Sequence, residues 1–374
     1  MHSVQLRHDM MQALRREDDG QTFLMAWTGG VKAAQLDQDR WRLLPVLHDR
    51  RPHVNGFYTQ SELARFLGER GLRFVAFQQI NWISGSYLSH WAPRIPGEQN
   101  YSLSPSDLWS NVARHLQDAR MRPRRGEIQG LTAEEFEEII DDASEAERLA
   151  QLISLSLRNL DTSVEHVASF YHDELINQMA DGNIEGRRSS SMRDQYLYEH
   201  VHSFFLHLGA VRDYLAAFIA DQIGKDSHAV DSMARLIDVI RARDIESSAL
   251  LKIVQSSAYI TPKDPPSTKW KASGWLDTAT DLRNEFVHRR TYGQRSAERM
   301  GSLRAADREA GVFRYFRPIA LETSDRDVFD VIVEHYEKVS ELLYRCAKAS
   351  GHNSSIPQLD PNDVISVQVT RTGS

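Results

Sequence analysis

One short segment of this chain carries three polar side chains that together can act on a phosphodiester. Arg283, Asn284 and His288 supply a guanidinium, an amide and an imidazole within six positions. On an α-helix, Asn284 and His288 lie about 40° apart around the axis, and the long side chain of Arg283 can reach them from about 100° to one side. Leu282 and Phe286 are apolar neighbours that can anchor the segment to a core. We therefore expect the three polar groups to converge on one spot.

These groups match the requirements of RNA cleavage without a metal ion. A base must take the 2′-hydroxyl proton, an acid must protonate the 5′-oxygen leaving group, and a positive group must hold the phosphate. Histidine exchanges protons near neutral pH, and arginine stays charged and binds two phosphate oxygens at once. One histidine cannot easily be both acid and base, whereas a two-fold interface would bring two copies of the segment together. This predicts a composite site in a homodimer.

The composition is that of an ordinary soluble protein. The 374 residues are 41% hydrophobic and 26% charged, and the net charge of -7 argues against a general nucleic-acid coat protein while allowing a local basic groove. The one cysteine, Cys346, excludes an internal disulfide and a cysteine-rich zinc module, and we expect it to be buried. No apolar run has the length of a membrane span or of a signal-peptide core. We expect a cytoplasmic protein with no metal, cofactor or membrane partner.

The first 126 residues combine strand and helix patterns. Residues 22–27 and 72–80 are predicted strands, and between them residues 59–71 have a capping box, a helical apolar stripe and a terminal glycine. A second helix is predicted to start at Ser104, with proline at its first position. We therefore predict a small α+β domain over residues 1–126, for which a sensor role is one interpretation.

Two segments of this domain have alternative interpretations. Residues 59–72 are similar in composition to a DNA-binding helix-turn-helix, but a strand-like run follows where a second helix is needed. This favours an amphipathic helix packed on a sheet. The basic segment at residues 120–126 is either a domain boundary or an arm that contacts phosphate, and the sequence does not separate the two.

From Thr132 onward the apolar residues repeat at helical spacing. The pattern predicts these helices: residues 132–180 (continuous, or broken near 141–144), 198–223, 229–243, 245–254, 278–292, and a last one that begins at Ser324 or Asp325. Residues 127–350 would therefore form an up-and-down helical bundle, in which polar side chains of facing helices can build a site. Residues 351–374 are predicted to be a polar tail with a strand-like run at 364–369. The fold class is mainly α.

The bundle and its late polar segment resemble the HEPN superfamily. The signature of that superfamily is an arginine, a polar residue and, four to six intervening residues after the arginine, a histidine on a late helix; Arg283-Asn284-Glu285-Phe286-Val287-His288 matches it. The resemblance covers roughly residues 135–348. It implies a metal-independent endoribonuclease that acts as a dimer, frequently as a toxin or in antiviral defence by abortive infection.

The resemblance also implies roles and partners. His288 would transfer protons, Arg283 would hold the phosphate and the transition state, and Asn284 would position them. The implied partners are RNA, a second copy of the chain, and an antitoxin or sensor protein. Some HEPN toxins carry, two residues after the histidine, a tyrosine that a partner nucleotidyltransferase modifies. This sequence has Arg290 at that position and departs from the pattern.

Basic and aromatic residues follow the motif closely. We expect an RNA-binding groove to include Arg289, Arg290, Tyr292 and Arg295. The alternative interpretation is a solvated loop whose arginines pair with nearby carboxylates, with Tyr292 buried or at the helix end. Three further histidines lie on the apolar helix, at spacings that make a poor metal site: His200, His202 and His207. We expect them to be partly buried or at an interface.

Two other classes of function remain open from the sequence. The first is a non-catalytic HEPN-like bundle that binds RNA, a nucleotide or a protein and tolerates the loss of His288. The second is a DNA-binding regulator that acts through residues 59–72. Binding of RNA without turnover would favour the non-catalytic bundle over an enzyme. Strongly salt-dependent binding to duplex DNA would favour the DNA-binding regulator.

Overall fold

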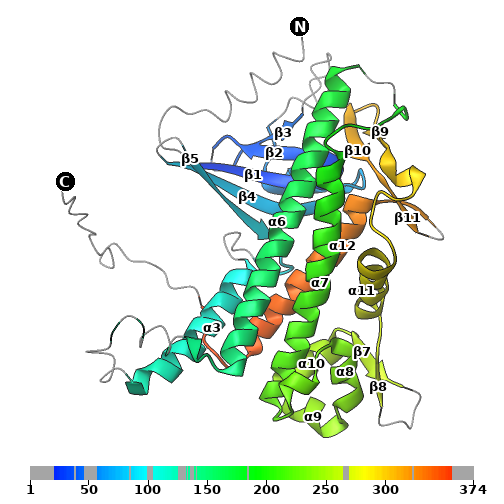
Figure 1. The fold of residues 1–374 in the computed structure, drawn as a ribbon. Helices are drawn as coiled ribbons and strands as arrows, with labels where there is room; N and C mark the ends of the chain where they lie inside the picture. The colour runs from blue at the N-terminus through cyan, green and yellow to red at the C-terminus, as the bar shows by residue number, and fades with distance from the viewer. Residues whose placement is uncertain are drawn as a thin grey trace.

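The computed structural model describes residues 21–37, 39–45, 57–83, 86–98, 104–124, 141–182, 185–263, 269–321 and 324–355, together with residues 132, 134 and 139. Helices dominate this part of the chain, which confirms the prediction of a mainly α protein. Long helices run through the molecule, a five-stranded sheet lies at one end of them, and short helices gather at the other end (Figure 1).

The N-terminal sheet is antiparallel, with strand order β3-β2-β1-β4-β5. Its strands are β1 (Gln21–Trp27), β2 (Lys32–Gln35), β3 (Trp41–Leu44), β4 (Phe74–Ile83) and β5 (Ser86–Pro93). In the register of the central strands, Met25 lies opposite Ala33 on one side and Phe77 on the other, and all three are buried. The two predicted strands are therefore neighbours at the centre of this sheet.

The helix starts predicted for the N-terminal part are confirmed. α2 (Gln60–Gly68) follows Thr59, whose hydroxyl accepts the Glu62 N–H while the Glu62 carboxylate accepts the Thr59 N–H. α3 (Pro105–Met121) follows Ser104, whose hydroxyl accepts the Ser106 N–H. The chain passes from α2 directly into β4. Residues 59–72 therefore lack the second helix that a helix-turn-helix requires.

The longest helices form the centre of the molecule: α6 (Glu145–Ala180), α7 (Asp194–Gln222) and α12 (Val328–Ala349). The hydroxyl of Ser144 accepts the Glu147 N–H and caps α6, so the helix break predicted near residues 141–144 is confirmed. Among the described residues, α7 alone is apolar and long enough to cross a membrane, but 67% of its apolar window is buried inside the protein. The apolar character of α7 follows from its place in the core.

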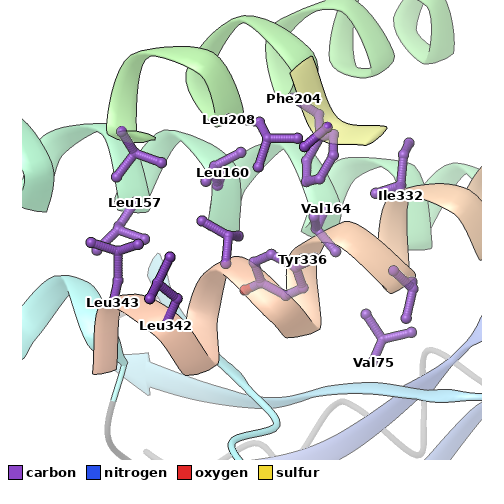
Figure 2. Packing of buried hydrophobic residues seen from close by; sticks show 14 of the residues in the cluster. Val75, Leu157, Leu160, Val164, Phe204, Leu208, Ile332, Tyr336, Leu342 and Leu343 are labelled. Carbon is purple, nitrogen blue, oxygen red and sulfur yellow. The ribbon is translucent and has the colours of Figure 1, made fainter. Parts of the chain in front are cut away.

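Sheet and helices share one continuous cluster of buried apolar side chains. Figure 2 shows Tyr336 and Ile332 of α12 between α6 and α7 on one side and Val75 of β4 on the other. Polar contacts cross the same interface, since the Trp91 Nε1–H donates to the Tyr336 hydroxyl (3.1 Å), which donates to Asp161 of α6 (2.5 Å). The sheet is thereby held to the helices by both packing and hydrogen bonds.

The structure differs from the predictions in two helical regions. The helix predicted over residues 229–243 is shorter: α8 (Met233–Val239) ends before Ile240, whose backbone is extended, and α9 (Ala242–Ser247) begins two residues later. α10 (Ala249–Ser256) follows. The last helix, α12, is capped by Asp327, whose carboxylate accepts the N–H groups of Phe329 and Asp330; the predicted caps, Ser324 and Asp325, lie in a strand.

Seven strands of the C-terminal part were missed by the predictions. They are β6 (Arg188–Ser189), β7 (Ile260–Pro262), β8 (Trp270–Ala272), β9 (Gly301–Asp307), β10 (Val312–Phe316), β11 (Pro318–Leu321) and β12 (Ser324–Asp327). β9 pairs with β10 and with β6, more than a hundred residues earlier, and β11 pairs with β12. The strand-like run at 364–369, the helical pattern around 135–138 and the end of the basic segment at 125–126 lie outside the described residues.

His172 of α6 is a buried histidine at the contact between helices and sheet. Its Nδ1 lies 2.7 Å from the carbonyl oxygen of Gly30, in the turn between β1 and β2, and its ring is 4% exposed. Burial, and next the nearby Lys32 ammonium, lower the pKa of His172 to about 3. The folded protein therefore keeps this ring neutral down to strongly acidic pH.

This histidine should make the fold sensitive to acid. An unfolded histidine has a pKa of about 6.5, so between about pH 6.5 and pH 3 the unfolded chain binds a proton that the folded protein does not. The free energy of unfolding is expected to fall with decreasing pH in this window, by up to about 1.4 kcal/mol per pH unit. His172→Gln, which keeps a donor for Gly30, is expected to show a shallower fall in urea denaturation between about pH 6.5 and pH 4.5. Equal slopes in the two proteins would contradict this.

Candidate active site

The arginine–histidine segment lies where a helix changes its winding. α11 (Trp275–Arg283) runs beside α7 (Figure 1), and from its end the chain continues as one π-helical turn, Asn284–Arg289. The N–H of Arg290 donates to the carbonyl of Glu285, five residues earlier (2.9 Å). The expected α-helix over residues 278–292 therefore ends early. Single π-turns are rare and frequently occur at functional sites.

The wider turn changes which side chains share a face. On an α-helix, Arg283 and His288 would lie about 140° apart around the axis. With about 4.4 residues per π-turn, the same two positions lie about 50° apart. The wider turn therefore reduces the angle between positions 283 and 288 around the helix axis.

Two apolar side chains hold this turn against α7, as predicted. Leu282 and Phe286 are both buried, and the Phe286 ring stacks on the Phe205 ring of α7 at a centroid distance of 4.9 Å. Val287 is partly buried against the same cluster. His288, by contrast, is exposed. The segment thus has one face fixed in the core and one face open to a ligand.

Arg283 lies against a glycine of α7. A Cβ atom added to Gly209 would lie 2.8 Å from the Nε atom of Arg283 and 2.9 Å from its Cγ atom, so only glycine leaves room for this side chain. The Arg283 Nη1 donates to the Asn284 Oδ1 over 3.4 Å, and its buried Nε has no hydrogen-bond partner among the described residues. Packing therefore fixes the aliphatic part of the Arg283 side chain, and part of its guanidinium stays available to a ligand.

A second arginine lies close to Arg283. Arg212 of α7 is 4% exposed, donates to the Thr280 hydroxyl (2.7 Å) and lies 3.8 Å from the Asp213 carboxylate. Burial and the charge of Arg283 lower the pKa of Arg212, against the opposing effect of Asp213. Burial raises the pKa of Asp213, and both arginines oppose that rise. Arg212, Arg283 and Asp213 therefore interact electrostatically, and the charge of Asp231 also acts on Asp213.

His202 of α7 touches the backbone of the motif. Its Nδ1 lies 3.1 Å from the carbonyl oxygen of Phe286, two residues before His288. A carbonyl oxygen only accepts, so Nδ1 is the donor in this hydrogen bond and Nε2 takes no part in it. The sequence predicted only that His202 would be partly buried or at an interface, because nothing in the local pattern shows that Phe286 would lie beside it. Its neighbour His200 instead stacks on His166 of α6, with ring centroids 4.2 Å apart.

An open groove begins at His202. It has a volume of about 800 Å³, within the usual range for ligand sites, and lies between the first half of α7 and residues 291–299. Its lining includes Tyr198, Glu199, Thr291, Gln294 and Arg299. Only Arg290 separates Thr291 from the π-turn, so a chain-like ligand in this groove would pass close to the motif.

The residues expected to bind RNA divide into two pairs. Arg289 is exposed, and Arg295 is exposed although its Nη1 donates to the Ala320 carbonyl (2.6 Å). The Arg290 side chain is only 9% exposed and pairs with Glu285 (2.7 Å) and Glu298 (2.8 Å). Tyr292 is 2% exposed, and its hydroxyl donates to the Pro318 carbonyl (2.9 Å). Arg290 and Tyr292 therefore hold the loop in place, and Arg289 and Arg295 remain at the surface.

No family model matches this chain, and no curated protein or solved structure is significantly similar to it. Among the described residues, no group of three or more His, Cys, Asp or Glu side chains is placed to hold a metal ion. The functional assignment therefore depends on the geometry of the arginine–histidine segment.

Proposed function

We propose that this protein is a metal-independent endoribonuclease of the HEPN type. The observation that carries the proposal is the π-turn that follows Arg283, since it begins at Asn284, contains His288 and leaves His288 exposed. The late position of this segment, after the long helices α6 and α7, agrees with the resemblance seen in the sequence. The guanidinium of Arg283, whose Nε has no hydrogen-bond partner among the described residues, suits a phosphodiester substrate.

The proposed reaction is an internal transfer of the phosphoryl group. A base removes the proton of the 2′-hydroxyl, the 2′-oxygen forms a bond to phosphorus, and the bond to the 5′-oxygen breaks. An acid then protonates the 5′-oxygen, so the products are a 2′,3′-cyclic phosphate and a 5′-hydroxyl. In this scheme His288 transfers a proton, Arg283 binds the phosphate oxygens, and Asn284 orients Arg283 through their hydrogen bond.

The reaction requires a second proton-transfer group. One source is His288 of the partner subunit in a homodimer, because a two-fold axis can place two copies of the segment face to face. The other source is His202 of the same chain, which lines the groove and uses only Nδ1 in its hydrogen bond to the Phe286 carbonyl. A role in toxin or antiviral defence, with an antitoxin or sensor partner and a cytoplasmic location, belongs to the same proposal.

Gly209 provides a test of the site that leaves the three polar residues intact. Purified protein is expected to cleave RNA in the presence of EDTA. Gly209→Ala is expected to lower the cleavage rate about 10- to 100-fold, because the new Cβ would displace Arg283. Gly68→Ala is the matched control, since a Cβ at Gly68 meets nothing within 4 Å, and its rate should not change.

The outcomes of this assay have distinct meanings. If wild-type protein binds RNA but releases no fragments, the bundle is a non-catalytic binding module and the proposal is wrong. If Gly209→Ala and Gly68→Ala cleave at the same rate, Arg283 is not held in a reactive position by α7. Thermal unfolding of both variants serves as the folding control, because alanine is a better helix former than glycine and neither protein should lose stability through helix propensity.

A further inference from the structure

A separate cavity lies in the N-terminal part of the molecule, away from the residues of the candidate active site. It has a volume of about 540 Å³, and residues of the sheet, α2 and α12 line it. Its apolar lining includes Met25, Trp27, Leu72, Phe74, Phe77 and Ile95. This size is typical of pockets for small organic molecules.

One wall of the cavity is aromatic and carries an unused hydrogen-bond donor. The rings of Trp27 and Phe74 have centroids 5.2 Å apart, and those of Phe74 and Phe77 are 4.7 Å apart. Trp27 is 2% exposed, and its Nε1–H has no hydrogen-bond partner among the described residues. Buried donors of this kind normally find a partner. A ligand with an acceptor atom on a flat ring would supply one.

One cation in the polar lining of the cavity forms no direct side-chain bond within the described residues. The Glu337 carboxylate of α12 pairs with Arg73 (2.8 Å), and the Glu98 carboxylate accepts a hydrogen bond from the Tyr344 hydroxyl. The Arg94 side chain is exposed and lines the same cavity; its charge acts on Glu337, but its guanidinium makes no hydrogen bond or ion pair within the described residues. The Arg94 guanidinium can therefore pair with an anionic group.

We propose that this cavity binds a small molecule made of a planar aromatic or heteroaromatic ring with an anionic substituent. The ring lies along the wall of Trp27, Phe74 and Phe77, an acceptor atom takes the Trp27 Nε1–H, and the anion pairs with Arg94. The volume accommodates one such ring system with its substituent. This site is independent of the proposed ribonuclease activity.

Paired probes test the proposal on the full chain. Adenosine monophosphate and indole-3-acetate carry a phosphate and a carboxylate, and adenosine and indole-3-acetamide are their neutral counterparts. Isothermal titration calorimetry is expected to show that at least one anionic probe binds roughly tenfold more tightly than its counterpart. Binding should also shift the indole N–H signal of Trp27 in ¹H–¹⁵N spectra. The probe that binds identifies the anion that the site prefers.

Variants locate the binding in this cavity. Arg94→Glu is expected to weaken binding of the anionic probe by roughly tenfold. Trp27→Phe is expected to weaken it by about three- to tenfold, because it removes the donor but keeps an aromatic ring. Arg42→Glu, an exposed arginine of the same sheet that does not line the cavity, should leave the affinity unchanged. The proposal is overturned if neither anionic probe binds at millimolar concentration or if neutral and anionic probes bind equally. It is also overturned if binding is lost in Arg283→Ala but kept in Arg94→Glu.

Discussion

Replacement of His288 by alanine is expected to reduce RNA cleavage by about 10²- to 10⁴-fold, the usual contribution of a proton-transfer residue. Arg283→Ala is expected to reduce it by about 10²- to 10³-fold, the usual contribution of one group that stabilises the transition-state charge. His288 is exposed at the end of the π-turn, so its loss should not affect folding. The measurement is the initial rate of cleavage of a labelled RNA in EDTA.

Two exposed residues outside the segment are the matched controls. His228 is an exposed histidine in the turn before α8, and the Arg243 side chain is 76% exposed. Alanine at either position should leave the rate unchanged. Full activity in His288→Ala would refute the proposed mechanism, and an equal loss in His228→Ala would point to a general effect on the protein.

The same assay identifies the second proton-transfer group. If His288 of the partner subunit supplies it, the specific activity should fall as the protein is diluted below the dimer dissociation constant, and His202→Gln should cleave nearly normally. If His202 supplies it, activity per chain should not depend on concentration, and His202→Gln should be strongly impaired. Glutamine can still donate to the Phe286 carbonyl, so this variant keeps the backbone contact.

The largest effect on stability is expected at Arg317. Its side chain is fully buried and makes two bonds of 2.8 Å to the Asp194 carboxylate, at the first turn of α7. It also donates to the carbonyls of Glu298 (2.9 Å) and Arg299 (2.6 Å). Burial alone would lower the pKa of Arg317, but the bonds to Asp194 raise it above its ordinary value. Arg317 therefore joins the C-terminal strands to α7 and to the loop that borders the groove.

Arg317→Met is expected to lower the free energy of unfolding by about 3–5 kcal/mol, because it leaves the buried Asp194 charge without a partner. Arg308→Met is the matched control, since the Arg308–Glu185 pair is also 2.8 Å long but the Arg308 side chain is 76% exposed. Its loss should cost about 0–1 kcal/mol. Urea denaturation of both variants provides the measurement, and a cost below about 1 kcal/mol for Arg317→Met would contradict the assigned role.

Local patterns were sufficient for the long helices and for some helix ends. The helix starts at Thr59 and Ser104 were predicted because the hydroxyl of each residue accepts from a backbone N–H only a few residues away. The apolar stripes of α6, α7 and α12 were visible because helical spacing places them on one face. The C-terminal strands were missed because a ladder such as β6 with β9 depends on residues far apart in the sequence.

The sequence by itself determined the chemical groups of the candidate site: Arg283, Asn284 and His288, with the apolar anchors Leu282 and Phe286. The tertiary structure decided how they are presented. Whether a helix ends in a π-turn depends on what packs against it, and here Phe286 stacks on Phe205 while Arg283 lies against Gly209.

Only long-range contacts could reveal the remaining features of the site, because each joins residues that are distant in the chain. In the folded chain, His202 contacts the Phe286 carbonyl and Arg212 lies near Arg283. Arg290 forms a buried ion pair with Glu298. A residue's type limits which bonds it can form, but the residue that lies beside it in the folded chain decides which bond it makes.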